Sequence, residues 1–171
     1  MSMKKTVLIF GLLSGAVSSG MMLVTLPFAD RIGFGRGSEV LGYTTIVLSF
    51  LLVFFGVRSY RENSGGTLTF ARGLTVGLLI TLISCTCYVA TWEVIYFKLA
   101  PNFAEKYSAY MVEHVKASGA SQQAIDAQVK QMENFKQMYN NPLMNAAITF
   151  TEPFPIGLVV ALVSAAVLRK K

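Results

Sequence analysis

The chain has 171 residues, a length that fits a single domain. Hydrophobic residues make up 53% of it and charged residues only 14%, against about 25% charged in an average soluble domain. A soluble protein this apolar would lack polar residues to cover its surface, so a soluble enzyme domain, a disordered tail and a nucleic-acid-binding module all fit the composition poorly. The net charge of +6 comes from basic residues beside apolar runs, which indicates membrane topology.

Four apolar stretches are long enough to cross a bilayer as helices. A helix needs about 20 apolar residues to span a hydrocarbon core of about 30 Å, and in lipid it must pair its backbone polar groups internally. The predicted spans are about 6–26, 40–57, 73–97 and 143–168. The sequence therefore predicts an all-α integral membrane four-helix bundle, with residues 1–171 forming a single membrane domain.

The first stretch has a second interpretation, a cleaved secretory signal peptide. Lys4 and Lys5 would then be its basic n-region. The apolar run is long, and no good small-x-small cleavage site follows it. We therefore favour a membrane span.

The distribution of lysine and arginine predicts the orientation of the spans. Eight basic residues lie at the termini and in the second connection, with only Glu62 against them. The other side carries seven basic and six acidic residues. Both termini are therefore expected in the cytoplasm. In the second connection, Arg58, Arg61 and Arg72 are expected to face anionic headgroups, each contributing about 1 kcal/mol.

The first connection, residues 27–38, is rich in glycine. Proline cannot continue a helix normally, so Pro27 is expected to end the first helix. Serine is a preferred N-cap, so Ser38 is expected to cap the second helix.

The third connection, residues 98–142, is the sizeable polar region of the chain, and apolar residues recur in it at helical spacing. It predicts helices over 102–118 and 121–140, with Ser121 as the N-cap of the second. We expect an extracytoplasmic helical hairpin inserted between the third and fourth spans. Its two apolar stripes either pack on each other or leave a surface for a partner. They are Phe103, Tyr107, Tyr110, Met111 and Val115 on one helix, and Ile125, Val129, Met132, Phe135 and Tyr139 on the other.

Small residues recur at four-residue intervals on three of the spans. Such faces let helix backbones approach closely in a membrane. The helix-packing residues predicted in this way are Gly11, Gly15, Gly73, Gly77, Gly157 and Ala161. They serve packing within the bundle or, alternatively, formation of a homo-oligomer.

Glu93 and Glu152 are the acidic residues within the spans. By helical rise both lie near the outer boundary of the bilayer, where a charge costs less than at its centre. One interpretation is structural: the two carboxylates accept hydrogen bonds and fix the outer end of the bundle. The other is a polar pocket for a cation, a proton or a ligand headgroup. Its candidate residues are Glu93, Glu152, Thr91, Tyr96 and Arg31.

Recognisable catalytic or metal-binding patterns are missing from the sequence. His114 is the single histidine, and one ligand makes no metal site. Cys85 and Cys87 lie two residues apart on a helix, on nearly opposite faces. We therefore expect no catalytic residues, no metal and no cofactor, and a protein that is not an enzyme.

The segment Gly56–Asn63, with Gly65-Gly66 and Thr69-Phe70 after it, resembles bacterial domain-of-unknown-function family 4199. The stretches Trp92–Tyr96 and Thr151–Gly157 are similar to it too, so that the resemblance covers nearly the whole chain. It implies a small four-helix protein of the bacterial inner membrane, and it implies no activity.

Two functions follow as expectations. The first is a non-enzymatic accessory, scaffold or interaction subunit that binds membrane lipids and a protein partner through residues 102–140, or a second copy of itself, and no nucleic acid. The second is a small transporter or channel-like protein with a polar outer pocket at Glu93 and Glu152. A transporter needs a continuous polar path, and below the two glutamates the spans offer mainly weakly polar Ser and Thr residues.

Overall fold

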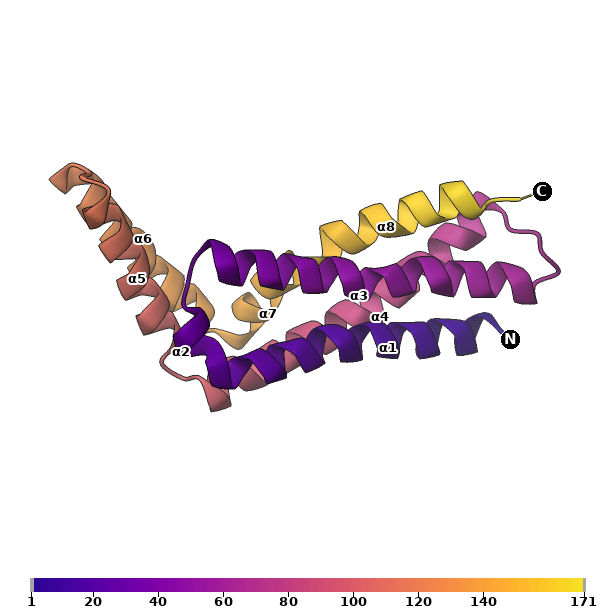
Figure 1. Ribbon diagram of the computed structural model, residues 1–171, viewed down its shortest axis with the longest axis horizontal. Helices are drawn as coiled ribbons and strands as arrows, with labels where there is room; N and C mark the ends of the chain where they lie inside the picture. The colour runs from indigo at the N-terminus through magenta and orange to yellow at the C-terminus, as the bar shows by residue number, and fades with distance from the viewer. Residues whose placement is uncertain (1, 171) are drawn as a thin grey trace. The chain divides into compact units, whose positions relative to one another are not determined.

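The computed structural model describes residues 2–170, and it is all-α, as predicted (Figure 1). The chain forms two compact units. Unit 1 comprises Met1–Trp92 and Thr149–Lys171, and unit 2 comprises Glu93–Ile148. The helices are α1 (Met3–Thr25), η1 (Leu26–Phe28), α2 (Ala29–Ile32), α3 (Arg36–Asn63), α4 (Phe70–Val94), η2 (Ile95–Leu99), α5 (Phe103–Ala117), α6 (Gln122–Tyr139), α7 (Pro142–Phe150) and α8 (Pro153–Leu168).

Four helical runs are long and apolar enough to cross a membrane, and each predicted span lies inside one of them. They are Met3–Ile32, Arg36–Asn63, Phe70–Leu99 and Pro142–Leu168. Their outward faces are apolar: Leu12, Leu48 and Val163 are each more than half exposed. Such side chains are costly in water and favourable in lipid, so the exposed faces fit a membrane protein.

The predicted end of the first helix near Pro27 is confirmed, because α1 ends at Thr25. Pro27 itself lies in the first turn of the short η1 helix, where its missing N–H is not needed. Helix α2 follows and ends at Gly33, whose φ of 67° suits glycine.

Ser38 is not the N-cap of the second span. Helix α3 begins at Arg36 after Gly35, which has a φ of 143° that lets the chain enter the helix early. Ser38 lies in the first turn, where its Oγ accepts from the Gly35 N–H at 3.1 Å and donates to the Gly35 carbonyl at 2.8 Å. The predicted cap at Ser121 is confirmed, since its Oγ accepts from the Ala124 N–H.

Unit 1 is built from α1, α3, α4 and α8, which run side by side (Figure 1). Helix α3 packs against both α1 and α8. The core between the helices is apolar, and its largest fully enclosed side chains include Phe50, Val53, Val57, Val76 and Ile80.

The predicted small-residue faces lie where these helices approach each other closely. A Cβ at Gly15 would lie 2.6 Å from the Cβ of Cys87, and one at Gly11 would lie 2.8 Å from the Cβ of Ile83. Because these separations are below van der Waals contact, glycine lets α1 lie directly on α4.

Small residues also allow the close contact of α4 with α8. A Cβ at Gly77 would lie 2.9 Å from the Cβ of Ala161, and one at Gly73 would lie 3.3 Å from the Cβ of Ala165. Gly157 in turn faces the side chains of Thr81 and Phe50. The small faces are thus filled by contacts within the chain.

A buried serine cluster joins three helices of unit 1. The Oγ of Ser14 on α1 hydrogen-bonds to the carbonyl of Ser49 on α3 and to the Oγ of Ser84 on α4, both at 2.9 Å. All three serines are at most 2% exposed. Interhelical hydrogen bonds of this kind contribute about 0.6 kcal/mol each in membrane proteins, so the cluster supports packing more than it drives it.

Unit 2 contains an antiparallel pair of helices, α5 and α6, which we call the α5–α6 pair (Figure 1). The predicted stripes meet in it: the ring of Tyr107 on α5 lies 5.3 Å from that of Phe135 on α6, between centroids. Phe135 also lies 4.2 Å from Tyr139, and Met132 is buried. The pair therefore has an aromatic core of its own.

Candidate functional site

Glu152 lies at a break in the fourth candidate span. Helix α7 ends at Phe150 and α8 begins at Pro153, so Thr151 and Glu152 form a turn between them. The Oε2 of Glu152 accepts a hydrogen bond of 3.0 Å from the Tyr88 hydroxyl on α4. A phenol donor stabilises a carboxylate where water is scarce, so this contact ties the broken helix to α4.

The two other pocket residues of unit 1, Arg31 and Thr91, do not bind Glu152. Within residues 2–170, neither Arg31 nor Thr91 forms a hydrogen bond or ion pair with its carboxylate. Tyr88 takes that role instead. Sequence reasoning missed it because the partner of Glu152 depends on the rotation of α4 relative to α8.

Glu93 and Tyr96 belong to unit 2. The Oε1 of Glu93 is enclosed and has no hydrogen-bond partner among residues 2–170. The Tyr96 side chain is 3% exposed, and its hydroxyl donates to the Oδ1 of Asn140 at 3.3 Å. Its ring lies 5.8 Å from that of Tyr139, so Tyr96 forms part of the core of unit 2.

A groove of about 430 Å³ runs along one side of the α5–α6 pair. Small and apolar residues form its floor: Ser108, Ala109, Val112, Val129 and Met132. Charged residues line it as well: Glu105, Glu113, Lys116, Glu133 and Lys136. Val129 is 39% exposed, whereas Ser108 and Met132 are buried, so the floor is only partly open to solvent.

The charged side chains of the groove have no partners within the chain. Across residues 2–170, none of the five forms an ion pair or a side-chain hydrogen bond. By contrast, Gln122 and Asp126, on the same α6 helix, do form a side-chain hydrogen bond of 2.9 Å. The groove thus leaves unpaired charges of both signs beside partly exposed apolar residues. Sequence reasoning missed this groove because it depends on the register of α5 against α6.

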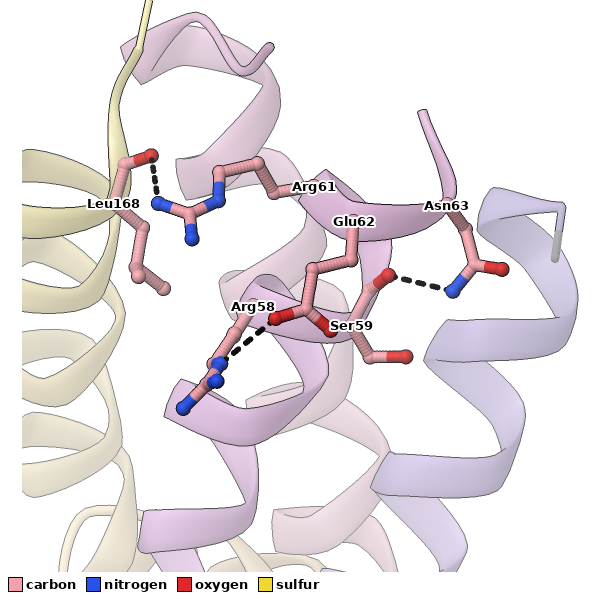
Figure 2. Close-up of polar contacts among 6 residues, drawn as sticks. All are labelled: Arg58, Ser59, Arg61, Glu62, Asn63 and Leu168. Carbon is pink, nitrogen blue, oxygen red and sulfur yellow. Dashed lines mark hydrogen bonds and ion pairs between the residues drawn. The ribbon is translucent and has the colours of Figure 1, made fainter. Parts of the chain in front are cut away.

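The basic end of unit 1 is partly engaged in contacts of its own (Figure 2). The Nε of Arg58 donates to Glu62 Oε1 at 2.9 Å, and the Nη1 of Arg61 donates to the Leu168 carbonyl at 3.4 Å. Arg61 therefore interacts with an unpaired carbonyl at the C-terminal end of α8, a favourable position for a cation. Arg72 is exposed.

The chain end beyond α8 is also attached at this side. The backbone N–H of Leu68 donates to the Lys170 carbonyl at 2.8 Å, and the Lys170 N–H donates to the Leu68 carbonyl at 2.9 Å. Leu68 is 3% exposed, so its side chain belongs to the core. These bonds hold the connection between α3 and α4 against the end of α8.

No metal centre emerges from the part of the chain that the structure describes. Over residues 2–170, His, Cys, Asp and Glu side chains do not gather in groups of three or more that could hold an ion. Cys85 is buried, Cys87 is half-buried, and both are free thiols.

The fold defines the class of protein: an all-α chain with four helices able to cross a membrane. Residues 9–170 match the family described as "Protein of unknown function (DUF4199)", so the chain belongs to this family, and the resemblance seen in the sequence is confirmed. Comparisons with curated proteins and with solved structures found no match.

Proposed function

We propose that this protein is a non-enzymatic interaction subunit of the bacterial inner membrane. The four spans anchor it, both termini face the cytoplasm, and the α5–α6 pair is its binding head on the outer side. The excess of lysine and arginine at the termini and in the connection 58–72 supports this orientation. Arg72 and the basic chain ends then meet anionic headgroups.

The observation that carries the proposal is the groove of the α5–α6 pair. It combines a partly exposed floor of small and apolar residues with five charged side chains that have no partner within residues 2–170. Burying such a floor and pairing such charges needs a second surface, and a helical surface of another protein supplies both.

The test is affinity purification of the tagged full-length protein in a mild detergent, with mass and composition read from the same peak. A stoichiometric second protein is expected. Glu113→Lys, on the groove, should reduce its recovery, whereas Lys130→Glu, on α6 but outside the groove, should not. Absence of any second protein, or equal recovery with both variants, would overturn the proposal.

A second candidate function is a small transporter or channel-like protein with a polar outer pocket. The observation that favours it is the contact of Tyr88 with Glu152 at a helix break in unit 1. Broken helices with acidic residues are typical of transport sites. Ion or proton flux into proteoliposomes should then fall in Glu93→Gln and Glu152→Gln but not in Glu39→Gln, which alters the first turn of α3.

A further inference from the structure

Three helices of unit 1 meet at the C-terminal end of α8. A Cβ at Gly73, in the first turn of α4, would lie 3.3 Å from the Cβ of Ala165, about one turn before α8 ends. The Nη1 of Arg61, near the end of α3, donates to the carbonyl of Leu168, the last residue of α8 (Figure 2). The ends of α3 and α8 and the start of α4 therefore adjoin.

Each of these helices brings at least one cation to this place. Arg61 comes from α3, Arg72 from the first turn of α4, and Arg169 and Lys170 follow α8 directly. The backbone of Lys170 is held there, because it exchanges two hydrogen bonds with Leu68, just before α4. We call Arg61, Arg72, Arg169 and Lys170 the basic cluster.

The basic cluster has no acidic partner in the described chain. Across residues 2–170, none of its side chains forms an ion pair, and Arg61 bonds only to a backbone carbonyl. In the stretches 40–92 and 153–171, which supply the cluster, Glu62 is the only acidic residue, and it pairs with Arg58 at 2.9 Å. Cations gathered at one place repel each other, so the cluster complements an anion with more than one negative charge.

The basic cluster lies at the depth of lipid phosphates. Arg61 follows the predicted span 40–57 by four residues, a helical rise of about 6 Å, and Arg72 and Arg169 directly flank two other predicted spans. The headgroup region of a bilayer borders the hydrocarbon core at this depth. On the bilayer side of the cluster, Val167 in the last turn of α8 is more than half exposed, which suits contact with an acyl chain.

We propose that the basic cluster is a binding site for a phospholipid with two phosphate groups, of the cardiolipin type. Arginine side chains bind phosphate oxygens with two parallel N–H donors, and the four cations of the cluster exceed what one phosphate neutralises. Once one phosphate is bound, the glycerol link keeps the second close, so its binding is intramolecular. A lipid with one phosphate lacks this second contact. This inference rests on the membrane anchoring in the proposed function and specifies the headgroup that the basic end binds.

The experiment is native mass spectrometry of the full-length protein in a mild detergent, titrated with cardiolipin and, separately, with phosphatidylglycerol. Half of the protein should carry one cardiolipin at a lipid concentration about fivefold lower than for phosphatidylglycerol, because the second phosphate adds contacts with cations. Equal affinity for the two lipids would overturn the inference.

Single charge removals distinguish a site from general attraction to a basic surface. Arg72→Gln should weaken cardiolipin binding about fivefold, and it removes an exposed side chain that forms no ion pair within residues 2–170. Lys4→Gln is the matched control, because it removes the same charge at the same end of unit 1 but from α1, which contributes nothing to the cluster (Figure 1). Lys4→Gln should leave cardiolipin binding unchanged, and equal losses in the two variants would overturn the site.

Two further arms identify the ligand and separate this inference from the proposed function. An excess of inorganic phosphate at constant ionic strength should not displace cardiolipin, and displacement would overturn the lipid assignment in favour of free phosphate. Glu113→Lys, on the groove of the α5–α6 pair, should leave cardiolipin binding unchanged. Cardiolipin preference without any protein partner would overturn the interaction function alone, and a protein partner without cardiolipin preference would overturn this inference alone.

Discussion

Gly77 on α4 gives the sharpest test of the packing in unit 1. A Cβ there would lie 2.9 Å from the Cβ and 3.2 Å from the Cα of Ala161 on α8. Optimal carbon–carbon contacts are about 3.5–4.0 Å, so α4 and α8 must separate by several tenths of an ångström to admit Gly77→Ala. Overpacking of this kind costs about 1–3 kcal/mol.

Gly42 on α3 is the matched control, because a Cβ there would meet nothing within 4 Å. Replacing glycine by alanine in a helix is favourable by about 0.5–1 kcal/mol at either site. That gain cancels in the comparison, so Gly77→Ala should be less stable than Gly42→Ala by about 1–3 kcal/mol, the overpacking cost alone.

The assay is reversible unfolding in a mild detergent, followed by the fluorescence of Trp92, the single tryptophan. Adding Ala161→Gly to Gly77→Ala removes the opposing methyl group and should recover about 1 kcal/mol relative to additive behaviour. The reasoning fails if the two alanine variants agree within about 0.5 kcal/mol, or if the second substitution gives no recovery.

Three further predictions concern hydrogen bonds. Ser14→Ala removes both hydrogen bonds of the buried serine cluster and should lower the free energy of unfolding by about 1 kcal/mol in the same assay. The control Thr86→Val loses only a hydrogen bond within its own helix and should lower it by less. Tyr88→Phe and Glu152→Leu should be non-additive by about 0.6 kcal/mol in a double-mutant cycle, and additivity would show that the contact does not contribute. Ser121→Ala should speed amide exchange in the first turn of α6, because it removes an N-cap that contributes about 1 kcal/mol. Ser121→Asp keeps a hydrogen-bond acceptor and should exchange as slowly as the wild type. Equal exchange in the two variants would contradict this.

The features that the sequence predicts well are those set within one helix. The spans follow from continuous apolar runs, and the helices of the α5–α6 pair follow from 3–4-residue periodicity. The packing role of Gly15 and Gly77 follows from their spacing on one face. Ser121 follows from a local preference for serine before a helix.

Features that depend on how two helices are rotated against each other lie beyond such reasoning. Gly56 on α3 is not part of a four-residue repeat of small residues, so the sequence does not mark it as a packing residue. A Cβ there would nevertheless lie only 3.0 Å from the Cγ of Phe10 on α1. The contact of Tyr88 with Glu152 and the groove of the α5–α6 pair likewise exist only once the helices have a register. At Ser38 the preference of serine for the N-cap gives the wrong position, because Gly35 is the N-cap of α3 and Ser38 lies in its first turn.

The contact of α1 with α4 has a consequence for biogenesis. Gly11 and Gly15 find their neighbours, Ile83 and Cys87, only after α3 and the connection behind it have been synthesised and inserted. Until then the glycine face of α1 is open to any helix in the same membrane. Nascent chains arrested before α4 should therefore associate with other helices through this face, and they should lose this association once α4 has been inserted.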